Sequence, residues 1–265
     1  MNRILIFTLF SAVFLLSCKS EYETIRTSNN PEKIYKAAQK YYKEKEYERA
    51  LGLYDLIIQY YRGRQEAEEL FLNYAYCHYY LNDYILASTY FKNYSSTFGN
   101  SENKQEAEYM AAYSNYRLSP NYRLDQTYTY KAIEGFEQFI NLYPYTERAD
   151  LATGLLDEMR KKLDIKAFEQ GMLYYKIGQY QSAITSFQAY INEFPETKKM
   201  EEVRFLLIKA AMELAEKSIY EKQKERYEEA LQHIETFSKK HASSRKMREV
   251  KEYKNIILKV LKNFA

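Results

Sequence analysis

The sequence has 265 residues and a formal net charge of +3, from 39 basic and 36 acidic side chains. Such a balanced charge excludes the strong electrostatic attraction that nonspecific nucleic-acid binding requires. Helix breakers are scarce, with 7 glycines and 4 prolines, which favours an all-α protein. Tyrosine is the outlier, since the chain has 30 tyrosines and no tryptophan. Because tyrosine combines an apolar ring with a polar hydroxyl, it suits both core edges and binding surfaces.

The beginning of the chain has the layout of a secretory signal. Arg3 is followed by an uncharged apolar run over residues 4–16. This run is too short for a membrane-spanning helix, which needs about 20 residues. An ordinary cleaved signal often ends in an Ala-x-Ala-like site, and this stretch has none. It ends instead in Leu-Leu-Ser before Cys18, which resembles a bacterial lipobox and implies that residues 1–17 are a signal peptide and that Cys18 carries a diacylglycerol and acyl anchor.

Residues 18–30 are predicted to form a lipidated, flexible tether, because the stretch from Ser20 to Asn30 is polar and ends at Pro31. The body would then contact the membrane through the anchor only. Cys77 is the only other cysteine, so we expect no internal disulfide, and stability must come from packing. Charged residues follow Cys18, and in some bacteria such residues send lipoproteins to the cell exterior, so the sequence by itself leaves the periplasmic and exterior leaflets open.

A pattern of small and aromatic residues recurs along the chain and predicts the fold. The first copy has Ala38, Tyr41, Tyr47, Ala50 and Tyr54. The same spacing recurs in Ala75, His78, Tyr84, Ala87 and Phe91, and again in Gly171, Tyr174, Tyr180, Ala183 and Phe187. Parts of the pattern remain in a third copy, with Ala132 and Phe136, and in a fifth, with Tyr227, Ala230 and Ile234. Small residues let two helices approach closely while aromatic residues fill the space around their contact.

This pattern is typical of tetratricopeptide helix pairs about 34 residues long. We therefore predict an all-α solenoid of about five such repeats, with turns at residues 43–46, 81–83 and 177–179. The copies are spaced by more than one repeat length, so insertions are expected at residues 119–126 and 217–226. Residues 244–264 should form a C-terminal capping helix. Its apolar stripe should contain Val250, Ile256, Ile257, Val260 and Leu261.

The sequence shows no enzyme signature. It has no Gly-rich phosphate loop, no His-Glu-x-x-His and no Gly-x-Ser-x-Gly. The histidines are scattered, and His78 occupies a repeat position where other copies have tyrosine, so we interpret it as a packed ring rather than a metal ligand. Cys77 is interpreted as a small buried apolar residue. We expect neither metal nor cofactor apart from the covalent lipid.

Helix geometry predicts a concave surface on the first helices of three repeats. Residues one and four after each small position, and three before it, should share an exposed face. These are Tyr35, Gln39 and Tyr42, then Leu72, Tyr76 and Tyr79, and, taking Ala112 as the third small position, Tyr109, Tyr113 and Tyr116. Any one of these tyrosines could equally be core. As a shared surface they would suit an extended peptide with aromatic side chains and a free carboxylate, with Arg117 and Arg123 as possible carboxylate partners.

The third repeat carries the more specific signal. Residues 116–120 read Tyr-Arg-Leu-Ser-Pro and lead to Arg-Leu-Asp-Gln-Thr at residues 123–127, with Phe136, Phe139-Ile140 and Tyr143-Pro144 beyond. Together with the lipobox and the repeats, residues 18–265 resemble the BamD (ComL/YfiO) family of outer-membrane β-barrel assembly lipoproteins. The chain departs from that family in its tyrosine excess and in a fifth repeat whose first helix has no clear match.

The resemblance implies a non-enzymatic assembly factor on the periplasmic face of the outer membrane. It implies that repeats 1–3, residues 31–145, bind the C-terminal targeting strand of unfolded outer-membrane proteins. It implies that repeats 4–5 and the cap, residues 146–265, dock to the POTRA domains of the barrel protein BamA, beside other lipoproteins of that machine. The alternatives are a glycan-binding uptake lipoprotein, which aromatic richness favours and the lack of tryptophan disfavours, and a cell-wall scaffold lipoprotein.

Overall fold

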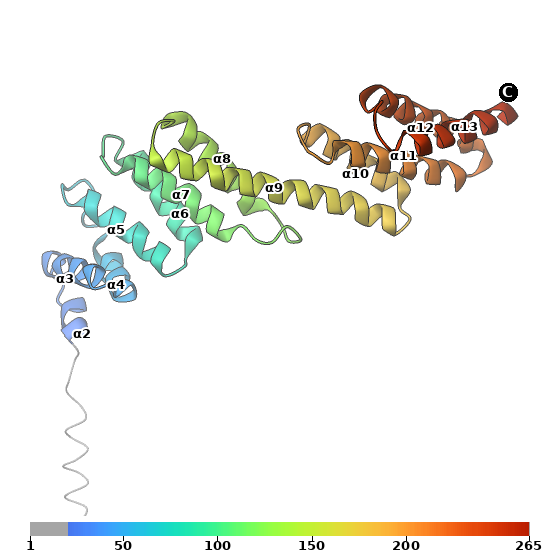
Figure 1. The fold of residues 1–265 in the computed structure, drawn as a ribbon. Helices are drawn as coiled ribbons and strands as arrows, with labels where there is room; N and C mark the ends of the chain where they lie inside the picture. Colours follow the sequence, from blue (N-terminus) through green and yellow to red (C-terminus); the bar gives the residue numbers. More distant parts are fainter. Residues whose placement is uncertain (1–20, 265) are drawn as a thin grey trace, which may run out of the picture. The chain divides into compact units, whose positions relative to one another are not determined.

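The computed structural model describes residues 21–264, and all the regular structure in this range is helical (Figure 1). Cys18 and the predicted signal peptide lie outside the described residues. The elements are α2 (Glu21–Arg26), α3 (Pro31–Lys43), α4 (Tyr47–Ile57), α5 (Ala67–Tyr80), α6 (Tyr84–Thr97), α7 (Lys104–Leu118), α8 (Thr127–Leu142), α9 (Glu147–Lys176), α10 (Tyr180–Glu193), α11 (Met200–Glu216), α12 (Tyr220–Lys240), α13 (Met247–Leu261) and the 3₁₀ helix η1 (Lys262–Phe264). None of the helices described between residues 21 and 264 has the length and apolar character needed to cross a bilayer.

The predicted helix pairs and their turns are confirmed. Three pairs, α3–α4, α5–α6 and α9–α10, are joined by the turns expected at residues 43–46, 81–83 and 177–179. At equivalent positions in these turns, Lys45, Asn82 and Gly178 have φ values of 62°, 63° and 75°. This left-handed conformation suits Gly and Asn and strains Lys, so the repeat imposes it on Lys45. The insertion at residues 119–126 forms the connection between α7 and α8, and the one at 217–226 falls in a short turn and the start of α12.

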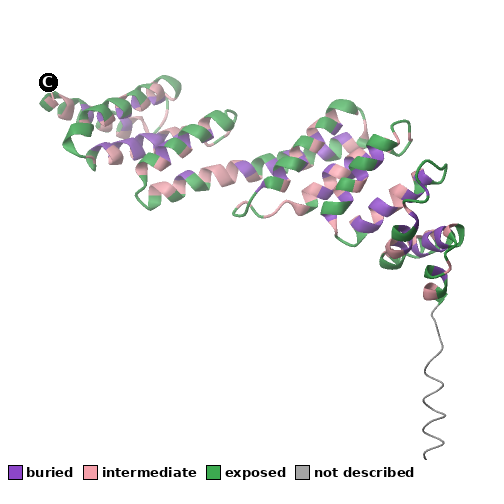
Figure 2. Cartoon of the chain, turned by 180° about the vertical axis from the view of Figure 1, so that it is seen from behind, coloured by how far each residue is buried: buried purple, intermediate pink, exposed green. Residues whose placement is uncertain are grey.

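The small residues lie on the buried seam of each helix pair, as predicted. Ala50, Ala87, Ala132, Ala183 and Ala230, all on second helices, are fully buried. Figure 2 shows the result as buried stripes along helices whose other faces are exposed. Aromatic residues one turn later, including Tyr54, Phe91 and Phe187, are also fully buried and fill the space beside the small residues.

The chain divides into two compact units. Within the described residues, one contains residues 21–120 together with Gln126–Leu156, and the other contains Asn121–Asp125 together with residues 157–264. The division lies inside α9 rather than at the expected boundary after residue 145, because α9 continues as one unbroken helix from Glu147 to Lys176.

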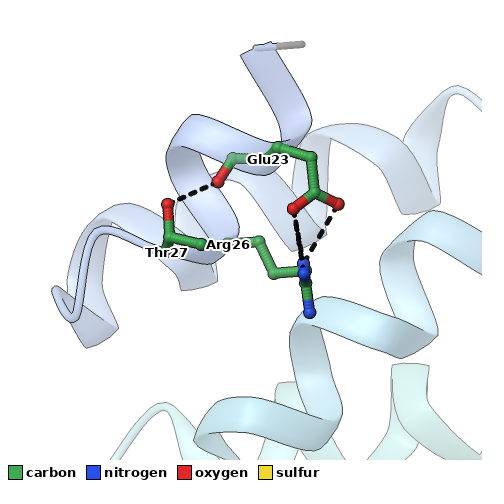
Figure 3. Close-up of polar contacts among 3 residues, drawn as sticks. All are labelled: Glu23, Arg26 and Thr27. Carbon is green, nitrogen blue, oxygen red and sulfur yellow. Dashed lines mark hydrogen bonds and ion pairs between the residues drawn. The ribbon is translucent and has the colours of Figure 1, made fainter. Parts of the chain in front are cut away.

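The tether prediction is wrong over residues 21–26, which form α2. Ile25 is 9% exposed and belongs to the core of the first unit, and the ring of Tyr22 meets that of Tyr41 edge-on at 5.8 Å. Arg26 donates to both oxygens of the Glu23 carboxylate, and the Thr27 hydroxyl donates to the Glu23 carbonyl at 2.7 Å (Figure 3). Residues 21–26 are mostly polar, but the helix they form has one apolar face, which packs on the first repeat.

The capping helix is confirmed as α13, with one correction to its apolar stripe. Val250 and Ile257 are fully buried and join the core of the second unit, against which Val260 and Leu261 pack. Ile256 is 49% exposed and does not belong to the stripe. It lies one residue, or about 100° of helix rotation, from Ile257, which takes the buried position.

A tyrosine hydroxyl joins the end of the second helix to the next connection in two repeats. The Tyr94 hydroxyl donates to Glu68 at 3.1 Å and lies 2.7 Å from the Ser101 hydroxyl. Tyr190 repeats the arrangement with Asp164 and with Thr197, whose hydroxyl lies at 2.8 Å. In the last repeat Phe237 takes this place, and the link runs from Ser244 to Glu201 without a ring hydroxyl.

Tyr94→Phe and Tyr190→Phe are each expected to lower the free energy of unfolding by about 1 kcal/mol, the net contribution of one buried hydrogen bond. The ring should stay in place, because Phe237 shows that phenylalanine fits this position. Urea denaturation followed by circular dichroism measures the change. Tyr145→Phe is the control, since Tyr145 is 98% exposed. Equal stability of all three variants and the native protein would contradict this role for the hydroxyls.

Two histidines should make the second unit sensitive to acid. Burial lowers the pKa of His233, and nearby Arg204 lowers it further; burial also lowers the pKa of His241. A lowered pKa in the folded state means that the unfolded chain binds protons more readily, so stability is lost as pH falls below about 6.5. Thermal melts between about pH 7.5 and 5.5 should show a falling midpoint, and His233→Gln with His241→Gln should flatten that slope. An unchanged slope in the double variant would exclude the histidines as its source.

Candidate peptide-binding surface

The first helices of three repeats, α3, α5 and α7, carry the residues predicted to form an exposed face. Seven of the nine lie at intermediate exposure: Gln39, Tyr42, Leu72, Tyr76, Tyr79, Tyr113 and Tyr116. The prediction of exposure is wrong for Tyr35 and Tyr109, which are 9% and 3% exposed. Their position, three residues before the small residue, is buried in α3 and α7, whereas Leu72 at the same position of α5 keeps intermediate exposure.

The two buried tyrosines have defined structural partners. Tyr35 packs on Tyr61 with ring centroids 5.0 Å apart, and its hydroxyl donates to Glu69 at 3.2 Å while accepting from Gln39 at 2.9 Å. Tyr109 packs on the rings of Phe136 and Phe139 in α8. These contacts join neighbouring helices, so Tyr35, Gln39 and Tyr109 support the surface from beneath.

A continuous series of tyrosine rings crosses the three repeats. In order it consists of Tyr42, Tyr47, Tyr80, Tyr79, Tyr113 and Tyr116, which we call the tyrosine row. Successive ring centroids are 5.7, 4.4, 5.6, 6.3 and 5.6 Å apart. These separations suit favourable stacked and edge-on contacts. The rings therefore hold one another in place and present a preorganised apolar surface with hydroxyls at its edge.

Sequence reasoning missed two members of the row, Tyr47 and Tyr80, and a flanking ring, Tyr84. Tyr47 and Tyr84 are the first residues of the second helices of their repeats. The recurring spacing predicts only that such aromatic residues fill the space between the two helices of a pair. In fact Tyr47 stacks on Tyr80 at the end of the next repeat's first helix, and Tyr80 is 45% exposed. The recurrence of an aromatic residue at the start of each second helix could have indicated them, if it had been used to predict contacts between neighbouring repeats as well as within one helix pair.

Arg117 lies at the end of α7, beside the row. Its guanidinium carbon lies 4.7 Å from the centre of the Tyr84 ring, and Nη1 donates to the Tyr79 hydroxyl at 3.3 Å. Lys217 occupies the corresponding place over Tyr180 in the second unit, at 4.6 Å, but there it pairs with Glu213 at 2.8 Å. Arg117 has no carboxylate partner among residues 21–264, so its charge remains available. Guanidinium is suited to bidentate binding of a carboxylate.

Two other charges near the row, Glu106 and Arg148, pair with each other. The Tyr76 hydroxyl donates to Glu106 at 3.1 Å, and Arg148 donates to both oxygens of the same carboxylate at 3.0 and 2.7 Å. Arg148 also lies 4.4 Å from the centre of the Tyr109 ring. This network fixes α5, α7 and the start of α9. Arg123, the second predicted carboxylate partner, belongs to the other unit, where it packs on the Tyr122 ring at 5.5 Å.

Three tyrosines of the surface have raised pKa values. Burial raises the pKa of Tyr42, Tyr76 and Tyr79, so their hydroxyls stay protonated and can donate hydrogen bonds. His78 is buried and stacks on Tyr90, which confirms it as a packed ring. Cys77 is fully buried, and burial raises the pKa of its thiol to about 12, as expected of a small core residue rather than a nucleophile. Within the described part of the chain, no group of His, Cys, Asp and Glu side chains is placed to hold a metal ion.

Comparison with known proteins places the sequence in a family. The sequence pattern of the family described as "YfiO: Outer membrane lipoprotein" matches residues 27–218, which is most of the chain. The outer membrane protein assembly factor BamD of Caulobacter vibrioides is 29% identical over 135 residues. The aligned region is 51% of this chain and 44% of that relative, so it spans less than half of the relative's length.

Solved structures of tetratricopeptide (TPR) domains are also similar. The TPR domain of P58(IPK) matches with a TM-score of 0.42 and 16% identity, covering 92% of this chain and 72% of that one. The TPR2AB domain of yeast Sti1, solved in a complex with pHSP90, matches with a TM-score of 0.38 and 13% identity, covering 84% and 96%. Both scores are low, and the fold assignment rests on the helix pairs described above.

Proposed function

Since the chain belongs to the YfiO family of outer membrane lipoproteins, we propose that it is a non-enzymatic assembly factor for outer-membrane β-barrel proteins. Cys18 carries the lipid, and the protein acts from the periplasmic face of the outer membrane. Its binding surface is the tyrosine row, which takes the C-terminal targeting strand of an unfolded barrel protein. The observation that carries this proposal is the unpaired Arg117 beside a preorganised row of tyrosine rings.

The chemistry of the row matches that of the proposed ligand. Strands of membrane barrels alternate apolar and polar residues and carry aromatic side chains at the membrane interfaces. Aromatic side chains of an extended strand can stack on Tyr80 and Tyr113, while its terminal carboxylate reaches Arg117. The rings are held by their neighbours, so little side-chain entropy is lost on binding.

We further propose that the residues from 146 onward, which include repeats 4 and 5 and the cap, dock to a barrel protein with POTRA domains, as in the BamA-type assembly machine. The support is family membership. Purification of the lipidated protein from its own outer membrane in mild detergent, followed by mass spectrometry, should recover such a protein as the main partner. Recovery of only sugar-uptake or cell-wall proteins would contradict this assignment.

Site-specific crosslinking tests the client surface. A photo-reactive amino acid at Tyr79 or Tyr113 should form adducts with unfolded barrel proteins in cells, and these adducts should contain the last strand of the client. The control is the same amino acid at Tyr145, which is 98% exposed and outside the row. Equal crosslinking at Tyr145, or unchanged levels of barrel proteins after depletion of the protein, would rule out the proposed role.

A further inference from the structure

Basic side chains are concentrated at the C-terminal end of the second unit. Residues 239–262 contain nine basic and two acidic residues, whereas the rest of the chain contains 30 basic and 34 acidic ones. This stretch, which includes the end of α12 and all of α13, therefore supplies the whole positive excess of the protein. Such an asymmetry of charge indicates an anionic partner.

Four of these residues lie along the exposed face of α13 and the residue that follows it. They are Arg248, Lys251, Lys259 and Lys262, which we call the basic stripe. Helix periodicity places them within about 80° of one another. They lie opposite Val250 and Ile257, which are fully buried. All four are exposed, and none of them takes part in an ion pair within residues 21–264.

The acidic residues of α13 do not neutralise the basic stripe. Glu249 lies about 100° around the helix from Arg248, and it accepts a hydrogen bond from the Tyr253 hydroxyl at 2.9 Å. Glu252 borders the stripe, so one carboxylate of α13 faces four basic side chains. The last helix of a helical stack needs a polar outer face to stay soluble, and residues of either charge would provide it. Solubility therefore explains why this face is polar but not why its charges are positive.

Exposed apolar side chains border the basic stripe. Leu258 and Ile256 flank it on α13 and are 42% and 49% exposed. At the end of the helix, the Phe264 ring meets the Tyr220 ring with centroids 4.9 Å apart. Tyr220 and its neighbour Ile219 are each 65% exposed. Basic residues beside exposed aliphatic and aromatic side chains are typical of surfaces that lie in the headgroup region of a bilayer.

We propose that the basic stripe binds anionic lipid headgroups of the membrane in which the protein is anchored. The lysine and arginine side chains contact the headgroup phosphates, while Leu258 and Tyr220 reach the boundary between headgroups and acyl chains. Each basic residue close to an anionic membrane surface strengthens binding about fivefold. The apolar side chains beside the stripe favour a membrane over an acidic protein surface, which would need only the charges.

This inference rests on the lipid anchor at Cys18 that is part of the proposed function. An anchored chain meets the bilayer at a high effective concentration, so a contact that is weak by itself becomes populated. The stripe would give the body a second membrane contact, where the sequence predicts contact through the anchor only. The first helices α9 and α11 remain available for the protein partner proposed above.

The absence of tryptophan from the chain permits a reporter at a single site. Leu258→Trp places one tryptophan beside the stripe at an exposed position. The full lipidated chain is reconstituted in vesicles of phosphatidylglycerol and phosphatidylcholine that contain brominated lipids, which quench tryptophan on contact. Fluorescence of this variant should be quenched at low salt, and quenching should fall at least about twofold at about 0.5 M salt, because salt screens the attraction. Vesicles of phosphatidylcholine alone should give little quenching.

Charge variants test whether the stripe itself is responsible. Arg248→Gln, Lys251→Gln and Lys259→Gln together, in the Leu258→Trp background, should reduce quenching to the level seen with phosphatidylcholine alone. The matched control replaces three exposed lysines of the same unit that lie outside the stripe. These changes are Lys161→Gln, Lys176→Gln and Lys198→Gln, which alter the net charge equally and should leave quenching unchanged.

Vesicle flotation checks the anchor separately. The acylated chain should float with both kinds of vesicle, with or without the stripe, and failure to float would contradict the anchor and with it this inference. If the chain floats, three results would overturn the stripe proposal alone: no quenching, equal quenching in both kinds of vesicle, or equal loss of quenching in the two triple variants. An unquenched reporter together with an acidic protein that co-purifies with the native chain, but not with the stripe variant, would assign the stripe to a protein partner instead.

Discussion

Gly171→Leu is expected to lower the free energy of unfolding by about 3 kcal/mol, near the upper end for overpacked cores. Gly171 lies in α9 at the small position of the fourth repeat and is buried. A Cβ atom there would lie 2.5 Å from Cε1 and 2.7 Å from Cδ1 of Phe187. Phe187 is fully buried, so its ring cannot move aside. The first and second repeats hold alanine at this position, so the requirement for glycine belongs to this helix pair.

Gly154→Leu is the matched control, in the same helix. Gly154 is exposed, and a Cβ atom on it would meet nothing within 4 Å. Leucine should therefore stabilise α9 by about 0.5–1 kcal/mol, because glycine is a poor helix former. Chemical denaturation should show that the same change, glycine to leucine, lowers the free energy of unfolding at one position of α9 and raises it at the other. Stabilisation by Gly171→Leu would show that Phe187 does not pack on this position as described.

The fold was predictable because its signal is local and repeated. Ala50, Ala87 and Ala183 recur at fixed distances from aromatic residues, and the turns between them fall where the pattern breaks. A spacing of this kind determines which residues of one helix face its partner, since helix periodicity is fixed. The seam within each pair could therefore be predicted residue by residue.

The contacts between repeats were less predictable. Tyr35 turns inward where the next repeat supplies Glu69, and Tyr109 turns inward where the second helix of its own repeat supplies Phe139. No rule of periodicity within one helix contains those partners. The row member Tyr80 was missed for the same reason. Its stacking on Tyr47 depends on how far one repeat is rotated against the next, which sequence spacing does not specify. The position of the tyrosines on the first helices could thus be predicted in outline, while the ring contacts that connect them depend on packing between helices.

Arg117→Gln is expected to weaken binding of a peptide ending in a free carboxylate by about 10- to 150-fold, the equivalent of about 1.5–3 kcal/mol for a charge-assisted hydrogen bond. The reason is that Arg117 holds an unpaired guanidinium in a fixed position over Tyr84, next to the tyrosine row. A synthetic peptide with alternating aromatic residues and C-terminal phenylalanine is the probe, and isothermal titration calorimetry measures its Kd. The control variant is Arg123→Gln, which removes the other predicted carboxylate partner from an exposed position outside the row.

The same peptide with a C-terminal amide separates the carboxylate contact from ring stacking. If Arg117 binds the carboxylate, the amide peptide should bind the native protein weakly and should be nearly insensitive to Arg117→Gln, because the interaction has already been removed. Arg117→Lys should recover only part of the affinity, since an ammonium group offers no planar, bidentate pair of donors. Tyr113→Ala should weaken both peptides alike, because ring stacking does not depend on the terminal group. If the amide and acid peptides instead lost affinity equally in Arg117→Gln, Arg117 would be supporting the rings of Tyr79 and Tyr84, and the carboxylate of the ligand would have no partner in the row.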